Sequence, residues 1–287
     1  MSASSSFSNP VGHLVGDHPR LVRVARLGWF AKGAVYVIAG VLALFVAAQA
    51  KGWSSSPAAG AQEASPTGAL KTVAGRSGGP VLLVALAIGL LLYAMWRVVS
   101  AFLPGSGGAK AWAKRVGFIV SAVLYLSFAI TALSLARGAS PSSANGNATV
   151  AKTSGGVLQH TGGRLAIGLA GLIVVAVGIY RMSKGLKKDV ADELDLSAVP
   201  APRRRLFVRL GAIGEVGRGV GVSLIGYFLL RSAIAYDANK ATGLDGALRV
   251  LVTKTGGALV VLVIGVGFVA YGLFCLATFT HRRLEAP

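Results

Sequence analysis

Six long runs of apolar residues, each nearly free of charge, constrain this chain more than any other feature of its sequence. They cover about residues 28–50, 79–102, 115–137, 164–184, 214–236 and 257–280. A helix needs about 20 mostly apolar residues to cross a bilayer. The runs lack the alternation of apolar and polar residues that a transmembrane barrel requires. The sequence therefore predicts an all-α polytopic membrane protein with six transmembrane helices.

Composition and charge agree with this class. Only 14% of the residues are charged and 54% are hydrophobic, whereas soluble proteins carry about 25% charged residues. The 29 Lys and Arg residues outnumber the 10 Asp and Glu residues. Because the basic residues lie mainly between the apolar runs, they are typical of membrane-protein loops rather than of a nucleic-acid-binding face. We expect no nucleic-acid partner.

The distribution of basic residues predicts the orientation of the chain. With the N-terminus placed in the cytoplasm, about two thirds of the Lys and Arg residues fall on the cytoplasmic side, as the positive-inside rule requires. About half of the Lys and Arg residues on the cytoplasmic side lie between Arg181 and Arg218, in and beside the linker that contains Arg203, Arg204 and Arg205. Both termini are therefore expected in the cytoplasm.

One tetrapeptide pattern occurs three times, each time at the start of the second apolar run of a pair. A basic residue and a hydroxyl residue precede two glycines in Arg76-Ser77-Gly78-Gly79, His160-Thr161-Gly162-Gly163 and Lys254-Thr255-Gly256-Gly257. In the first run of each pair, Gly28, Gly117 and Gly214 align, and Tyr36 matches Tyr125. This is the signature of an internal repeat.

Each repeat holds two crossings, so all three repeats share one orientation. This predicts three parallel helical hairpins related by a pseudo-threefold axis along the membrane normal. The predicted division is a cytoplasmic tail at 1–25, repeat 1 at 26–103, repeat 2 at 114–185, a cytoplasmic linker at 186–208 and repeat 3 at 209–283.

The three tetrapeptides have a structural and a functional interpretation. Ser77, Thr161 and Thr255 are expected to cap the helices that follow, and the basic residues to lie at the headgroup level. Alternatively, the helix N-termini and cations bind a phosphate or lipid headgroup. That candidate anion or headgroup site consists of Arg76, Ser77, His160, Thr161, Lys254 and Thr255.

A second candidate is a basic pair on the cytoplasmic side, Lys32 and Arg218, which occupy equivalent places in repeats 1 and 3. Long basic side chains near helix ends commonly extend to the membrane interface. If they face the axis instead, they attract anions. Glu215 and Arg218 are spaced for a salt bridge on one helix face.

Groups for catalysis are sparse. Cys275 is the only cysteine and lies in an apolar run, and the four histidines are scattered. No hydrolase, metalloprotease or phosphate-loop motif occurs. We expect no enzymatic activity, no cofactor and no metal site.

The segments TGALKTVAGRSGGPVLLVALAIGLLLYAMWR and DGALRVLVTKTGGALVVLVIGVGFVAYGLF, each following a glycine-punctuated helix, resemble a bacterial membrane-protein family. That family is catalogued as domain of unknown function 1206, and the resemblance covers about residues 20–283. It implies three tandem two-helix units and a bacterial plasma-membrane location. Repeat 2 departs most, since His160 replaces Arg or Lys there.

The sequence favours a non-enzymatic structural or accessory membrane component that binds lipid or a membrane-protein partner. The alternative is a transporter or channel for a small neutral or anionic solute along the pseudo-threefold axis. A polar axis would favour the alternative, and an apolar, closed axis would favour the structural component.

Overall fold

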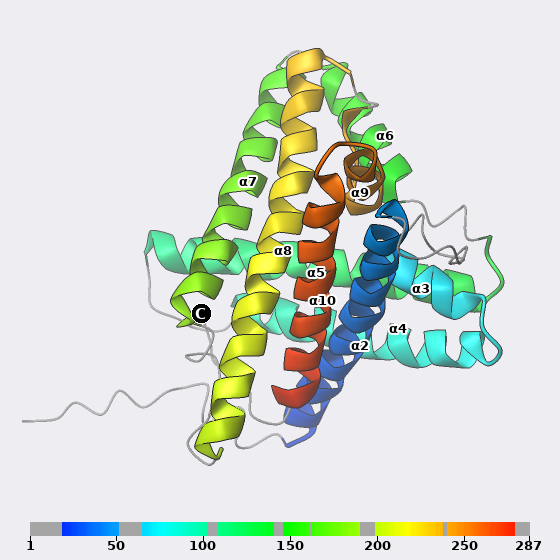
Figure 1. The fold of residues 1–287 in the computed structure, drawn as a ribbon, viewed down its shortest axis with the longest axis vertical. Helices are drawn as coiled ribbons and strands as arrows, with labels where there is room; N and C mark the ends of the chain where they lie inside the picture. Colours follow the sequence, from blue (N-terminus) through cyan, green and yellow to red (C-terminus); the bar gives the residue numbers. More distant parts are fainter. Residues whose placement is uncertain are drawn as a thin grey trace, which may run out of the picture.

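The described chain is helical and contains no strand within residues 19–51, 65–102, 108–140, 146–160, 162–189, 199–237 and 240–278 of a computed structural model. This confirms the predicted all-α class. The long helices in Figure 1 are α2 (Pro19–Ala50), α4 (Gly79–Phe102), α5 (Ala109–Ala136), α7 (Gly163–Lys187), α8 (Ala201–Ala235) and α10 (Gly257–Thr278). The short helices are α3 (Pro66–Ala74), α6 (Gly146–Leu158) and α9 (Leu244–Val252).

The six long helices contain the six predicted crossings. The segments long and apolar enough to span a membrane are Leu27–Ala50, Gly79–Phe102, Lys114–Ala136, Gly163–Lys187, Ala201–Ala235 and Gly257–Thr278. The chain is thus a multi-pass membrane protein.

The fifth of the six long helices, α8, begins earlier than predicted. It begins at Ala201, although the apolar run begins near 214. Hydropathy misses the first turns because they carry three consecutive arginines, and the proline in the first turn is compatible with a helix start. The last residues of the predicted linker 186–208, from Ala201 onward, therefore belong to α8.

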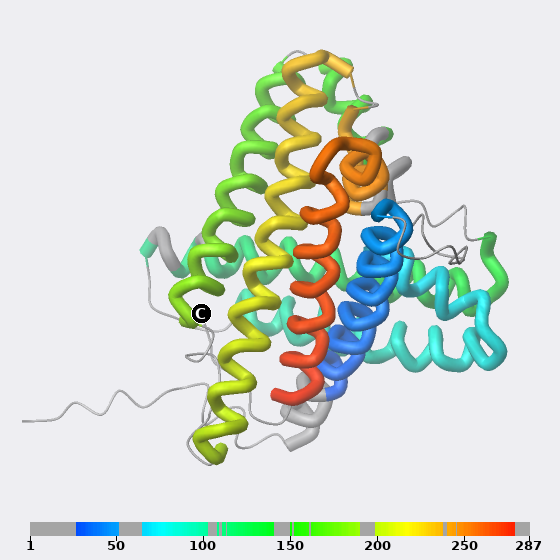
Figure 2. The backbone as a smooth tube through the Cα atoms, viewed as in Figure 1, coloured from blue at the N-terminus to red at the C-terminus, as the bar shows by residue number. Residues whose placement is uncertain are grey.

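The helices pack in pairs that cross the repeat boundaries. The most extensive contacts join α7 to α8, α10 to α2 and α4 to α5, while α8 with α10 and α2 with α4 complete the bundle. In Figures 1 and 2, α7, α8, α10 and α2 run steeply, and α4 and α5 run across them. Among the described residues, α5 and α7 do not pack closely against each other. Repeats 1 and 3 thus form packed hairpins, whereas the two long helices of repeat 2 pack on the neighbouring repeats. The pseudo-threefold axis stays a prediction.

Glycines allow the two tightest helix pairs to approach closely. A Cβ atom on Gly40 of α2 would lie 2.8 Å from the carbonyl oxygen of Gly265 in α10. In the same way, a Cβ atom on Gly178 of α7 would lie 2.7 Å from the carbonyl oxygen of Gly219 in α8. Small residues at such contacts are the usual means of packing helices in lipid, because no hydrophobic effect drives the helices together there.

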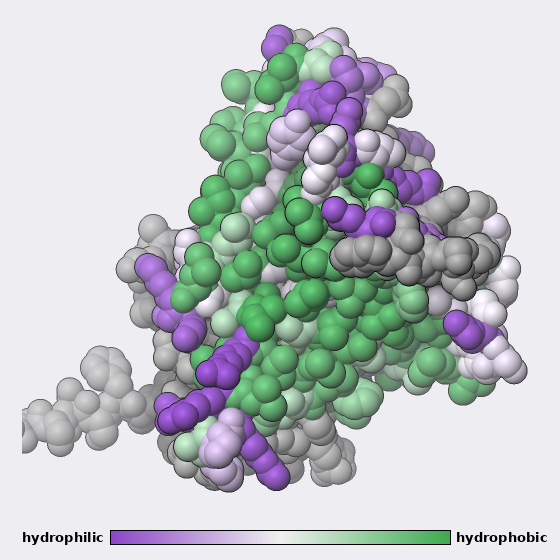
Figure 3. Space-filling view, in the orientation of Figure 1, coloured by the Kyte–Doolittle hydropathy of each residue, from purple (hydrophilic) through white to green (hydrophobic). Residues whose placement is uncertain are grey.

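The outer surface is largely apolar. Figure 3 shows hydrophobic side chains covering much of one face of the bundle, with hydrophilic side chains gathered toward its two ends. The large exposed side chains include Leu172 and Ile173 of α7, and Val120 and Val123 of α5. A surface of this kind is suited to contact with lipid.

Candidate functional site

Lys32 lies inside the bundle. It is 2% exposed, although it is a lysine in the second turn of the first spanning segment. Its ammonium donates a 3.0 Å hydrogen bond to the hydroxyl of Tyr93 on α4. Four ring centroids surround the Nζ atom, those of Trp29 at 4.3 Å, Tyr93 at 4.7 Å, Tyr271 at 5.1 Å and Tyr125 at 5.3 Å. The rings come from α2, α4, α10 and α5, so four helices enclose one cation.

Arg97 on α4 joins the same cluster. Its Nε donates a 2.9 Å hydrogen bond to the Tyr93 hydroxyl, which therefore accepts from two cationic side chains. The guanidinium lies 5.0 Å from the ring of Phe118 and 5.8 Å from that of Trp29. Contacts between a cation and a ring contribute about 0.5–2 kcal/mol each, and most when both groups are desolvated.

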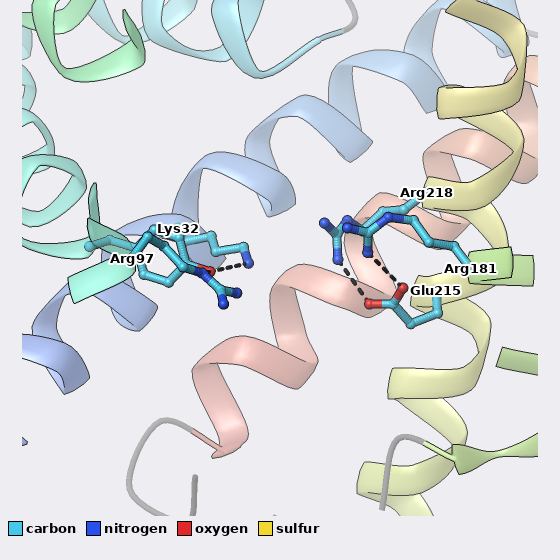
Figure 4. A network of polar contacts seen from close by, with 6 residues as sticks. Lys32, Arg97, Arg181, Glu215 and Arg218 are labelled. Carbon is cyan, nitrogen blue, oxygen red and sulfur yellow. Dashed lines mark hydrogen bonds and ion pairs between the residues drawn. The ribbon is translucent and has the colours of Figure 1, made fainter. Parts of the chain in front are cut away.

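A buried ion-pair triad lies beside this cluster (Figure 4). Glu215 of α8 accepts from Arg218 of the same helix at 2.9 Å and from Arg181 of α7 at 3.0 Å. The predicted pair of Glu215 with Arg218 is confirmed, and Arg181 adds a partner from another helix. The Glu215 and Arg218 side chains are 10% and 11% exposed, so the contact between them is largely shielded from solvent, whereas the Arg181 side chain is 34% exposed.

Tyr271 connects the two halves of the site. Its ring centroid lies 3.9 Å from the Arg218 guanidinium and 5.1 Å from the Lys32 ammonium. Arg218 also lies 5.3 Å from the ring of Tyr36. We call the whole set the cation–aromatic core, which consists of Trp29, Lys32, Tyr36, Tyr93, Arg97, Tyr125, Arg181, Glu215, Arg218 and Tyr271.

The core holds more positive than negative charge. Within the six spanning segments Glu215 is the only acidic residue, whereas the core contains four basic residues, of which Arg181 and Arg218 contact Glu215 and Lys32 and Arg97 contact Tyr93. Charges in a region of low dielectric constant interact strongly, and desolvating each of them is costly. Such an arrangement can attract and hold an anion. Its one carboxylate is engaged by two arginines.

The structure places the predicted basic pair inside the bundle. Lys32 is 2% exposed and the Arg218 side chain is 11% exposed, and both lie over the ring of Tyr271. Their position relative to the cytoplasmic membrane interface stays a prediction. The cause of their burial is local, because the Tyr93 hydroxyl and ring faces are partners for Lys32, and the Glu215 carboxylate and ring faces are partners for Arg218.

The tetrapeptide residues are not gathered into one site. Arg76, Ser77, His160, Lys254 and Thr255 are exposed, and Thr161 lies outside the described residues. In Figure 1, the helix that follows the first tetrapeptide, α4, starts at the right, whereas α7 starts at the top. Binding of a phosphate or lipid headgroup at these turns stays a prediction.

The turns themselves repeat closely, and at α7 the cap differs from the prediction, whereas capping of α4 by Ser77 and of α10 by Thr255 stays a prediction. In each turn the backbone amide of the second glycine donates a hydrogen bond to the backbone carbonyl of the basic residue. The distances are 2.8 Å for Gly79 to Arg76, 2.9 Å for Gly163 to His160 and 2.9 Å for Gly257 to Lys254. The first glycines adopt positive φ values of 76°, 82° and 79°. The N-cap of α7 is Gly162, with no capping side chain. The pattern therefore encodes a tight turn that needs glycine at its third position, as type II turns do.

Sequence reasoning missed Tyr93, Arg97 and Tyr271 as parts of a site. Tyr93 and Tyr271 occupy equivalent places in repeats 1 and 3, and repeat 2 has Val177 there. Each tyrosine packs on the aligned glycine of its own repeat, Gly28 or Gly214, where an added Cβ would lie 2.7 Å from the tyrosine Cβ. The tyrosine at the same position of repeats 1 and 3 was therefore the sequence signal that could have identified Tyr93 and Tyr271.

Comparison with known proteins gives a family without an activity. The family model described as "Domain of Unknown Function (DUF1206)" matches three segments, residues 27–103, 116–188 and 213–278. The three matches support the internal repeat. The chain is 31% identical over 269 residues to a Bacillus subtilis (strain 168) protein described as "Uncharacterized protein YxxB", covering 93% of both chains. No solved structure matches.

Proposed function

The chain belongs to the DUF1206 family, and on that premise we propose that it is a non-enzymatic protein of the bacterial plasma membrane that binds and passes a small anion through its helical bundle. Both termini lie in the cytoplasm in this proposal. The excess of Lys and Arg in the segments assigned to that side supports the orientation.

The observation that carries this proposal is the charge of the cation–aromatic core. Four basic side chains, Lys32, Arg97, Arg181 and Arg218, share a region with one carboxylate, Glu215. Intramembrane charges are costly, and they commonly mark the pathway or binding site of an ion. A core built only for packing would be expected to use apolar residues at these positions, because replacing buried ion pairs with apolar residues is often neutral or stabilising.

A non-enzymatic role is supported by the state of the reactive groups. Acid–base catalysis needs a titratable group positioned to exchange a proton with a substrate. Glu215 is instead held by two guanidinium groups, and the thiol of Cys275 is fully buried.

Anion flux into proteoliposomes tests the proposal. Vesicles containing the purified protein are expected to take up chloride, nitrate, sulfate or phosphate faster than protein-free vesicles do. Lys32→Met is expected to abolish that uptake, and the matched control Lys51→Met, at an exposed position, is expected to leave it unchanged. Absence of both anion binding and uptake by the wild-type protein would overturn the proposal.

A structural role is the second candidate, and the glycine-mediated contacts of α2 with α10 and of α7 with α8 favour it. Close backbone packing makes these pairs suited to a rigid scaffold, and the apolar surface suits lipids or a membrane-protein partner. In this case the wild-type protein would bind no anion and would co-purify with a defined membrane-protein partner.

A further inference from the structure

We infer that the core contains a site for one monovalent anion at the hydroxyl of Tyr125, beside Lys32 and Arg218. This inference rests on the proposed function and deepens it, because it names the position and the class of the ligand.

The first step is the state of the Tyr125 hydroxyl. Tyr125 is 3% exposed, and its oxygen makes no hydrogen bond to any described residue. Buried polar groups are hydrogen-bonded in the great majority of cases, since an unsatisfied one loses its interaction with water without replacement. This hydroxyl is therefore suited to donate to a ligand.

The second step is the surroundings of that hydroxyl. The ring of Tyr125 packs edge-on against Tyr93 with centroids 4.6 Å apart, and the Lys32 ammonium lies 5.3 Å from its centroid. Arg218 lies 3.9 Å from the ring centroid of Tyr271, and the Lys32 ammonium lies 5.1 Å from the same centroid. A ligand cation would be repelled by both basic groups, whereas an anion would be attracted by them and would accept the hydroxyl proton in a hydrogen bond.

The third step sets the charge of the ligand. The cost of removing an ion from water rises steeply with its charge, and this site is walled by aromatic rings. Multiply charged oxyanions such as phosphate are usually held by guanidinium groups that bind two oxygens at once. Both guanidinium groups of the triad already donate to Glu215. A halide or nitrate, with one charge and a weaker hydration shell, fits these donors better than sulfate or phosphate does.

Anion titration of the full-length protein in lipid nanodiscs tests the inference, with chloride, nitrate and sulfate as probes and calorimetry as the readout. Tyr125→Phe removes only the hydroxyl oxygen. It is expected to weaken binding of chloride and nitrate by about 10- to 100-fold, because a hydrogen bond to a charged group is lost. Tyr227→Phe, at a tyrosine that is 53% exposed, is the matched control and is expected to leave affinity unchanged.

The outcomes separate this inference from the proposed function. If the wild-type protein binds chloride or nitrate and Tyr125→Phe binds them equally well, the anion lies elsewhere and the inference is wrong. Tighter binding of sulfate than of chloride overturns the assignment of a monovalent ligand. If the wild-type protein neither binds nor takes up any anion, the proposed function itself fails. Thermal unfolding provides the folding control, since Tyr125→Phe removes an unsatisfied hydroxyl and is expected to keep or raise the melting temperature.

Discussion

The ammonium of Lys32 and the hydroxyl of Tyr93 are joined by a 3.0 Å hydrogen bond between α2 and α4, the two long helices of repeat 1. The contact occurs where Gly28 lets the backbone of Tyr93 approach α2. Glycine packing and the placement of a buried charge are therefore coupled within one hairpin. The following predictions separate their contributions.

Replacing Lys32 with methionine is expected to preserve the fold and to keep or raise the melting temperature. The change removes a buried charge and keeps a side chain of similar length that can pack against the same rings. Thermal unfolding in detergent measures this effect. A fall of several degrees would mean that the ammonium stabilises the fold and would weaken the argument that it is retained for an anion.

Replacing Glu215 with glutamine is expected to destabilise the protein by about 3–5 kcal/mol, because the buried Arg218 guanidinium and the partly exposed Arg181 guanidinium then lose their countercharge. Arg181→Met is expected to cost less, since the Arg181 side chain is 34% exposed. The control is Asp237→Asn at the exposed pair with Lys240, where the N–O distance is 4.0 Å and the expected loss is about 0–1 kcal/mol. Chemical unfolding compares the three variants, and equal losses for Glu215→Gln and Asp237→Asn would contradict the prediction.

Alanine at the aligned glycines is expected to give different results in different repeats. Gly28→Ala and Gly214→Ala place a Cβ 2.7 Å from the Cβ of Tyr93 and of Tyr271, and should destabilise by about 1–3 kcal/mol through overpacking. Gly117→Ala meets nothing within 4 Å among the described residues and should be neutral or slightly stabilising, as expected in a helix. The same loss at all three positions would show that repeat 2 packs like the other repeats.

The tetrapeptide turns are expected to depend on their first glycine. Gly78→Ala and Gly256→Ala meet no atom within 4 Å, so their cost of about 1–2 kcal/mol comes from the positive φ alone. Gly156→Ala, in α6 with equally open surroundings, is the control and should not destabilise. Melting temperatures of the three variants provide the comparison; a neutral Gly78→Ala would indicate that the backbone at this turn readily changes conformation.

Cysteine labelling is expected to report the orientation of the chain. The native Cys275 is buried and should not react. In intact cells a membrane-impermeant maleimide should label Ser140→Cys, in the connection assigned to the outside, and should not label Asp189→Cys, in the cytoplasmic connection. Both positions are exposed, so accessibility within the protein is matched. Labelling of the opposite residue would invert the topology.

The number and approximate limits of the crossings could be predicted from the amino-acid sequence alone, because apolar length and the spacing of charges reflect the thickness of the bilayer directly. The sequence also indicated the repeat, since the turn that joins each short helix to a long one requires the same two glycines. Hydropathy gives little information on how each helix is rotated about its axis. A lysine near the end of an apolar run satisfies hydropathy equally well at the interface or among aromatic rings.

The inward direction of Lys32 depends on packing between helices, because its partners Tyr93, Tyr125 and Tyr271 come from three other helices. The positions of α5 and α7 against the neighbouring repeats depend on packing of the same kind. At the place where Tyr93 and Tyr271 pack on a glycine, α7 has Val177, which is 43% exposed. Repeat 2 therefore lacks the tyrosine that packs the two long helices together in repeats 1 and 3. Contacts with the neighbouring repeats determine where its helices lie.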